Sequence, residues 1–186
     1  MADQTIVSDK KQNPKEALKP QAVVDRSTGI TFQNIRTLTR EESRAVLPIG
    51  DLGRSKSAPE IGALRVATFV DRNRPSTVPG ISTEAKLPNV NNSRHSILIN
   101  SEFIKGGDAG SKIVAISFAI AHHDFTSKLG PSKGLSPELE RMAASLASKK
   151  ALERDILPKV TDPKLKDQIS KAIERMIKSE DIGKKK

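Results

Sequence analysis

The stretch that decides the fold is Ser111–Asp124, SKIVAISFAIAHHD. Its large apolar residues occupy every second position, at Val114, Ile116, Phe118 and Ile120, and the positions between them are small. Period-two alternation places one set on each face of an extended strand, and β-branched residues suit that geometry. The alanines would tolerate a helix, but a helix would spread the large residues around its whole circumference. We therefore expect a central strand at 111–124.

A β-rich core is expected on the N-terminal side of this strand. Apolar or alternating runs predict three further strands, at 29–36, 63–70 and 95–104. Ile35 breaks the alternation of the first strand. The Gly-rich segment 105–110 joins the third strand to 111–124, which predicts a hairpin. Thr39 followed by Glu42 has the spacing of a capping box and predicts a short helix that ends near Leu47.

The C-terminal part of the chain predicts two helices. Ser136 and Pro137 supply an N-cap and a proline at the first helical position, and Asp162 and Pro163 repeat that chemistry. Helical spacing then aligns two apolar stripes, Leu139, Met142, Ala143 and Leu146 in the first helix and Leu165, Ile169, Ala172, Ile173 and Met176 in the second. We expect a helical hairpin with charged outer faces, which either packs on the open face of the sheet or self-associates.

These elements predict an α+β fold in four segments. Residues 1–28 form a flexible, disordered N-terminal arm, and residues 29–130 form a core of small antiparallel β-sheet or β-sandwich type. Residues 135–182 form the C-terminal α-helical hairpin, and residues 183–186 form a basic tail.

The composition indicates a basic, aliphatic protein. The chain of 186 residues carries 32 Lys and Arg against 22 Asp and Glu, a net charge of +10 that is spread along the sequence. Such a field attracts phosphates or anionic lipid head groups, although it also suits a merely solvated surface. The N-terminus does not resemble a signal peptide, and the longest apolar segment is too short to cross a bilayer, so we expect a protein of the cytoplasm.

Arginines beside a strand end are the candidate phosphate contacts. Asp71 is followed by Arg72 and Arg74, and guanidinium forks match phosphate oxygens. The predicted nucleic-acid-binding set is Arg65, Arg72, Arg74, Arg94 and Lys112, of which the last four are expected to cluster at one end of the sheet. The alternative is a solvated turn with local ion pairs. Because the chain has five Phe and neither Trp nor Tyr, contacts should go to phosphates and tolerate any sequence.

Catalytic and metal-binding functions are not expected. His122, His123 and Asp124 form the one cluster of catalytic residue types, but neighbours on a strand face opposite sides and a third metal ligand is missing. A polar strand end is the simpler interpretation. The segment Lys105–Lys112 lacks the pattern of a phosphate-binding loop, and the chain has no cysteine. We therefore predict no enzyme, no catalytic residue, no metal and no cofactor.

The order of elements resembles the thirty-kilodalton (30K-like) movement-protein superfamily of plant viruses. The similarity spans roughly residues 30–130, and its motif is an aspartate after an apolar strand, here Asp71 after LRVATFV. The resemblance implies sequence-tolerant binding of single-stranded nucleic acid, more often RNA, and cell-to-cell transport at plasmodesmata. The alternative is a viral matrix or coat protein of the virion that assembles on nucleic acid or an anionic membrane surface and self-associates through its C-terminal helices.

Overall fold

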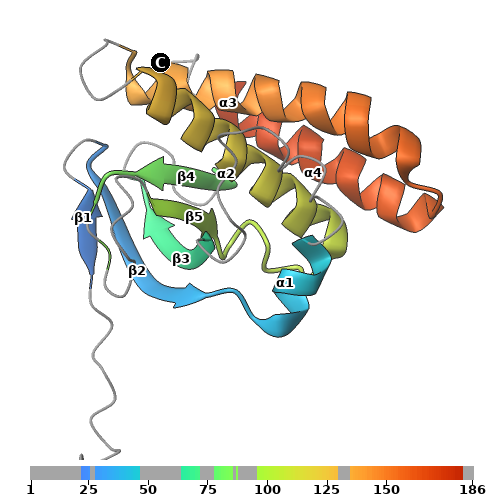
Figure 1. The fold of residues 1–186 in the computed structure, drawn as a ribbon, viewed down its shortest axis with the longest axis horizontal. Helices are drawn as coiled ribbons and strands as arrows, with labels where there is room; N and C mark the ends of the chain where they lie inside the picture. Colours follow the sequence, from blue (N-terminus) through green and yellow to red (C-terminus); the bar gives the residue numbers. More distant parts are fainter. Residues whose placement is uncertain are drawn as a thin grey trace, which may run out of the picture.

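The computed structural model describes residues 22–25, 28–46, 64–71, 78–85, 87, 96–129 and 135–181. Five strands form one curled sheet in the order β1-β2-β3-β5-β4 (Figure 1). The strands are β1 (Val23–Asp25), β2 (Ile30–Thr37), β3 (Leu64–Val70), β4 (Gly80–Thr83) and β5 (Ser96–Asn100). Neighbouring strands are antiparallel except β3 and β5, which are parallel. The α+β class is confirmed, and the sheet is mixed.

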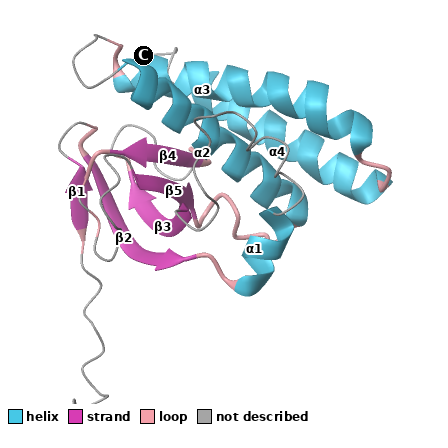
Figure 2. Cartoon of the chain, viewed as in Figure 1, coloured by secondary structure: helices cyan, strands magenta, loops and turns pink. Residues whose placement is uncertain are grey.

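The helices form two further layers above the sheet (Figure 2). Helix α2 (Ala109–Leu129) lies on the sheet, where it contacts β4 and β5, and α3 (Pro137–Ala151) and α4 (Pro163–Asp181) pack on α2. A π-helical turn η3 (Leu152–Ile156) and a 3₁₀ turn η4 (Leu157–Lys159) continue α3 toward α4. The short helix α1 (Arg40–Val46) follows β2 and contacts α2.

The expected strand at 111–124 is wrong, because these residues belong to α2. The expected hairpin with 95–104 is therefore wrong as well. Asp108 caps the helix, and its Oδ1 accepts a hydrogen bond from the backbone N–H of Ser111 at 2.7 Å. Helix α2 is surrounded by the sheet on one side and by α3 and α4 on the other, so it buries apolar residues around its whole circumference.

The small residues of the alternating pattern serve close packing of α2 rather than one face of a strand. Ala115 and Ala119 are one helical turn apart and lie against Gly80 of β4. A Cβ on Gly80 would lie 3.3 Å from the Cβ of Ala119 and 2.6 Å from the backbone oxygen of Leu98. Small side chains therefore let the helix approach the sheet closely.

The break at Ile35 reflects a β-bulge in β2. Gln33 pairs with Thr68 and Arg36 pairs with Val66, so β2 contains one more residue than β3 in this interval. Asn34 adopts a φ of 52°, a left-handed conformation that asparagine tolerates better than most residues. The extra residue moves Ile35 out of the alternation.

Two other strands differ from expectation. The expected strand 95–104 ends at Asn100, because Asn100 accepts a hydrogen bond from the N–H of Glu102 at 2.9 Å and starts a turn. Its side-chain amide also donates to the backbone oxygen of Val78 at 2.9 Å. Strand β1 lies within the segment expected to form an arm.

The helical hairpin is confirmed, and both caps are as predicted. The N–H of Leu139 donates to Ser136 Oγ at 3.3 Å, and the N–H of Lys164 donates to Asp162 Oδ1 at 2.9 Å. The predicted stripe of α4 faces the core, where Ile169, Ala172, Ile173 and Met176 are buried. The stripe of α3 behaves differently: Leu139 and Leu146 are exposed, so the outer face of this helix carries apolar as well as charged side chains.

Candidate nucleic-acid interface and interhelical pocket

The junction of β2 and α1 is held by a capping box around Glu42. The N–H of Glu42 donates to Thr39 Oγ1 at 3.1 Å, and the N–H of Thr39 donates to Glu42 Oε2 at 2.8 Å, as the spacing predicts. Arg36 adds a bidentate pair to the same carboxylate, at 2.7 and 2.9 Å. These bonds, that of Arg36 above all, lower the pKa of Glu42 to about 2, so Glu42 is ionised near neutral pH.

Five basic side chains surround this junction, and we name them the α1 basic corner: Arg36, Arg40, Arg44, Arg65 and Lys112. Arg40 and Arg44 are exposed and one helical turn apart, so they share a face of α1. Arg65 pairs in register with Thr37, next to Arg36. Lys112 lies close enough to Glu42 to lower its pKa electrostatically. The corner therefore draws on β2, α1, β3 and α2.

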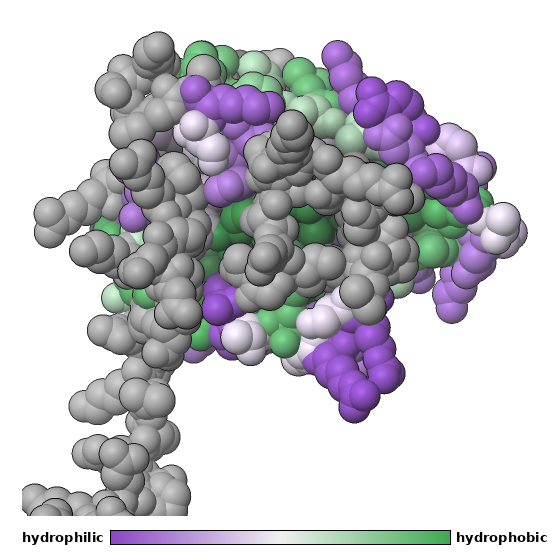
Figure 3. All heavy atoms as spheres, in the orientation of Figure 1, coloured by the Kyte–Doolittle hydropathy of each residue, from purple (hydrophilic) through white to green (hydrophobic). Residues whose placement is uncertain are grey.

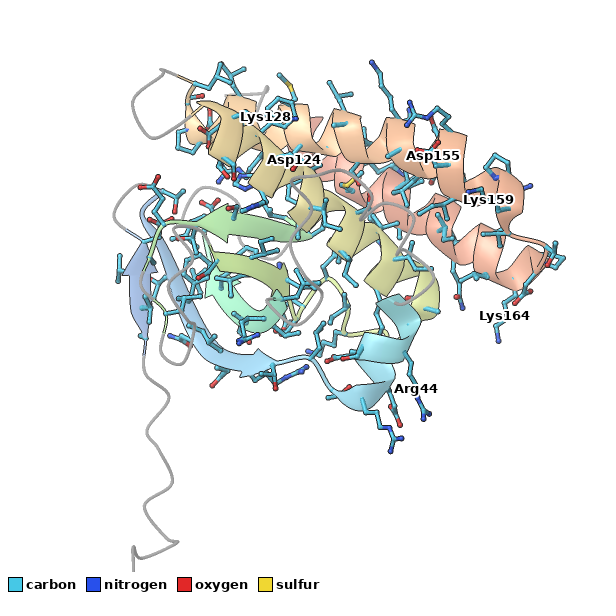
Figure 4. All side chains as sticks on the ribbon, in the orientation of Figure 1. Arg44, Asp124, Lys128, Asp155, Lys159 and Lys164 are labelled. Atoms are coloured by element: carbon cyan, nitrogen blue, oxygen red, sulfur yellow. The ribbon has the colours of Figure 1, made fainter. Side chains whose placement is uncertain are left out.

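The corner is cationic and reaches into solvent. The acidic residues of α1 itself are Glu41 and Glu42, and Glu42 is already engaged by Arg36. Arg40 and Arg44 make no ion pair with any residue in the described part of the chain. Figure 4 shows Arg44 projecting away from the rest of the molecule, and Figure 3 shows a hydrophilic surface where α1 lies. Two exposed guanidinium groups on one face can donate hydrogen bonds to neighbouring phosphates.

The predicted binding residues fall into two groups. Arg65 and Lys112 both lie at the α1 basic corner, whereas Arg72, Arg74 and Arg94 lie outside the described residues. Sequence reasoning missed Arg36, Arg40 and Arg44. The capping box was a usable signal for them, because it fixes a helix in which residues 40 and 44 share a face.

Asp71, the residue carried over from the movement-protein resemblance, is part of a buried ion pair. Its Oδ2 accepts a hydrogen bond from Arg141 Nη1 of α3 at 2.8 Å, and both side chains are about 4% exposed. The pair connects the end of β3 to the outer helical layer. Because the carboxylate is buried in this ion pair, we interpret Asp71 as a residue that holds the fold together.

The cluster at residues 122–124 lies on α2 and does not converge. His122 is buried, stacks on Phe118 and accepts a hydrogen bond at Nδ1 from the N–H of Ser82 at 2.7 Å. His123 lies near Ser127, with 3.3 Å between Nε2 and Oγ. The described residues contain no group of three or more His, Cys, Asp or Glu side chains placed to hold a metal ion.

A pocket of about 530 Å³ opens between α2 and α3, within the size range of small-molecule sites. The pocket exists because the residues between the two helices are small: Ala121, Ala147 and Ala151. Ile120 and Phe125 form its apolar wall on α2. Polar groups stand around it: Ser117, Asp124, Lys128, Ser148, Arg154 and Asp155.

The charged groups of the pocket come from both of its walls. In Figure 4, Asp124 and Lys128 lie along α2 and Asp155 lies toward the far end of the outer layer. Ser148 donates to Ser117 at 2.9 Å, and Arg154 and Asp155 pair with each other at 2.7 Å. Arg154 and Asp155 belong to the π-helical turn η3, a rare feature that is frequent at functional sites. The lining suits an apolar group with a charged end.

No protein-family model matches the chain, and comparisons with curated proteins and with solved structures give no match either. In the described part of the chain, no helix has the length and apolar character needed to span a membrane.

Proposed function

We propose that this protein is a non-enzymatic, sequence-tolerant nucleic-acid-binding protein that contacts phosphates through the α1 basic corner. The observation that carries the proposal is the clustering of basic side chains from four elements around α1: Arg36 is offset by Glu42, whereas Arg40 and Arg44 are exposed on one helical face. Phosphate contacts by such groups supply affinity without reading sequence.

The placement of the aromatic residues supports contacts to the backbone rather than to bases. Phe32, Phe69, Phe103 and Phe118 are buried, Phe125 packs against the core, and the chain contains no other aromatic residue of the Phe, Trp or Tyr type. Proteins that grip single strands by stacking need exposed aromatic faces. We therefore expect little preference between single-stranded sequences. That the strand is RNA is what the movement-protein resemblance implies.

The movement-protein resemblance would make this binding part of cell-to-cell transport of a plant virus. Its one carried-over residue, Asp71, is enclosed by Arg141, so transport would depend on the basic surface instead. A fluorescent fusion in leaf cells should then mark the walls between neighbouring cells, and the Arg40→Glu/Arg44→Glu variant should reduce spread. Labelling of cell walls without any strand binding in solution would contradict this proposal.

A charge-reversal experiment tests the binding surface. Arg40→Glu/Arg44→Glu changes the net charge by four units at the corner, and Lys164→Glu/Lys166→Glu makes the same change on exposed residues at the start of α4. Binding of a fluorescent 20-nucleotide single-stranded RNA at fixed salt should weaken at least about tenfold more in the α1 variant than in the α4 control.

Each result of that comparison has a clear meaning. Equal losses in both variants would show that only the total charge matters, which contradicts a defined surface. No loss in the α1 variant would also contradict the proposal. Circular dichroism of both variants establishes that the fold is unchanged.

A further inference from the structure

Helix α3 has its amphipathic character reversed. The residues that it buries are Arg141, Ala144, Ser145 and Ser148, which are polar or small. Its larger apolar residues face outward: Leu139 is 45% and Leu146 is 50% exposed. A helix that used its apolar face only for its own core would show the opposite arrangement. The outer face of α3 is therefore available for another apolar surface.

The exposed residues form a regular seam. Leu139, Met142 and Leu146 follow one another at spacings of three and four residues, and Met142 is half-buried. This is the spacing by which one helix presents a stripe to another helix. In Figure 2, α3 forms the upper edge of the helical layers, on the side away from the sheet.

The charges of α3 are arranged to complement a reversed copy of the same helix. Acidic residues, Glu138 and Glu140, occupy the first turn, and basic residues, Lys149 and Lys150, occupy the last. Glu138 and Lys150 are exposed and lack ion-pair partners in the described part of the chain. In an antiparallel pair, the acidic first turn of each helix lies beside the basic last turn of the other, once on each side of a two-fold axis.

We propose that α3 pairs with α3 of a second copy of this chain, antiparallel and about a two-fold axis. The seam buries itself against its own copy, and the ends of the two helices attract each other. An anionic membrane fits less well, because the acidic first turn would face the lipid head groups. A single pair of 15-residue helices is a small interface, so the dimer should be weak and concentration-dependent.

Sedimentation velocity of the full chain without nucleic acid tests this pairing directly, independently of the nucleic-acid proposal. The wild-type protein should shift from monomer to dimer as its concentration rises through the micromolar range. Leu139→Ser/Leu146→Ser should raise the dissociation constant at least about tenfold. Val70→Ser, which removes an apolar side chain that is 46% exposed on β3, should leave it unchanged.

A charge swap tests the antiparallel direction of the pair. Glu138→Lys alone and Lys150→Glu alone each reduce the attraction between the acidic end of one helix and the basic end of the other, and each should weaken the dimer. The double variant Glu138→Lys/Lys150→Glu restores opposite charges across the interface and should regain the wild-type dissociation constant. A monomer at every concentration would overturn the proposal, and so would a dimer that these variants do not affect. Binding to anionic vesicles by a purely monomeric protein would assign the seam to lipid instead.

Discussion

The buried pair of Asp71 and Arg141 gives the sharpest prediction for stability. Replacing either residue removes this ion pair and leaves the other charge buried, since both side chains are about 4% exposed. Loss of one member of a buried pair costs about 3–5 kcal/mol. For a chain of this size, that corresponds to a fall in Tm of about 6–20 °C, at 2–4 °C for each kcal/mol.

The double variant separates the charge from the packing. Asp71→Leu/Arg141→Met replaces both charges with apolar side chains, so neither charge is stranded, and such replacements are often nearly neutral. Arg141 Nε lacks a hydrogen-bond partner in the described structure, so the pair is incompletely compensated to begin with. Each single variant should therefore lose far more free energy of unfolding than the double variant.

Chemical denaturation of the four proteins of this cycle measures the coupling. Asp167→Ala is a matched control, because Asp167 and Lys171 form a pair at 2.7 Å whose side chains are mostly exposed. That variant should lose less than about 0.5 kcal/mol. A stabilising buried pair would be refuted if replacing Asp71 or Arg141 alone lowered the free energy of unfolding by less than about 1 kcal/mol. It would also be refuted if the effects of the two single replacements simply added up in the double variant.

Two further predictions concern other contacts. Glu42→Gln should destabilise the protein by about 1–2 kcal/mol at pH 7, because folding lowers the pKa of Glu42 from 4.5 to about 2. The pKa shift alone would give a larger loss, but Arg36 is partly exposed and solvent weakens its attraction for Glu42. Wild-type stability from this group is present above pH 4.5 and is lost as the pH falls toward 2, so acid denaturation curves of the two proteins should converge there. Gly110→Ala should cost about 1–3 kcal/mol, because a Cβ would lie 2.5 Å from Gln168 of α4. Gly106→Ala, with 3.5 Å to its nearest neighbour, should be close to neutral in thermal melts, and equal effects of the two would contradict the close crossing of α2 and α4.

Local signals in the sequence predicted the helix ends well. The capping box of Thr39 and Glu42 and the caps at Ser136 and Asp162 all appear where side-chain chemistry places them. Such motifs depend on residues three or fewer positions apart, so they operate before any tertiary contact forms. The apolar stripe of α4 was equally informative, because α4 buries one face only.

The alternating pattern at 111–124 led to the wrong prediction of a strand, because a buried helix does not show the polar and apolar faces that mark a helix in the sequence. Residues 113–119 of α2 are buried on all sides, so this part of the sequence lacks a polar face and the 3.6-residue period, and an accidental period of two remains. The length of the segment and the capping Asp108 before it favoured a helix.

The outward stripe of α3 could not be assigned from the sequence for a different reason. Its Leu and Met spacing predicts an apolar face, but not which surface covers that face. Arg141 is drawn inward by Asp71, which is seventy positions earlier in the chain. The α1 basic corner similarly depends on β3 and α2 meeting α1, which only the tertiary fold brings about.

The most direct test of phosphate binding at the α1 basic corner is a salt titration of single-stranded RNA binding. Arg40→Gln/Arg44→Gln removes two cations without adding negative charge. The slope of log affinity against log salt should become shallower by about 1.4, which corresponds to two lost contacts with a single strand. An unchanged slope in this variant, or wild-type affinity that does not depend on salt, would contradict phosphate binding at this corner.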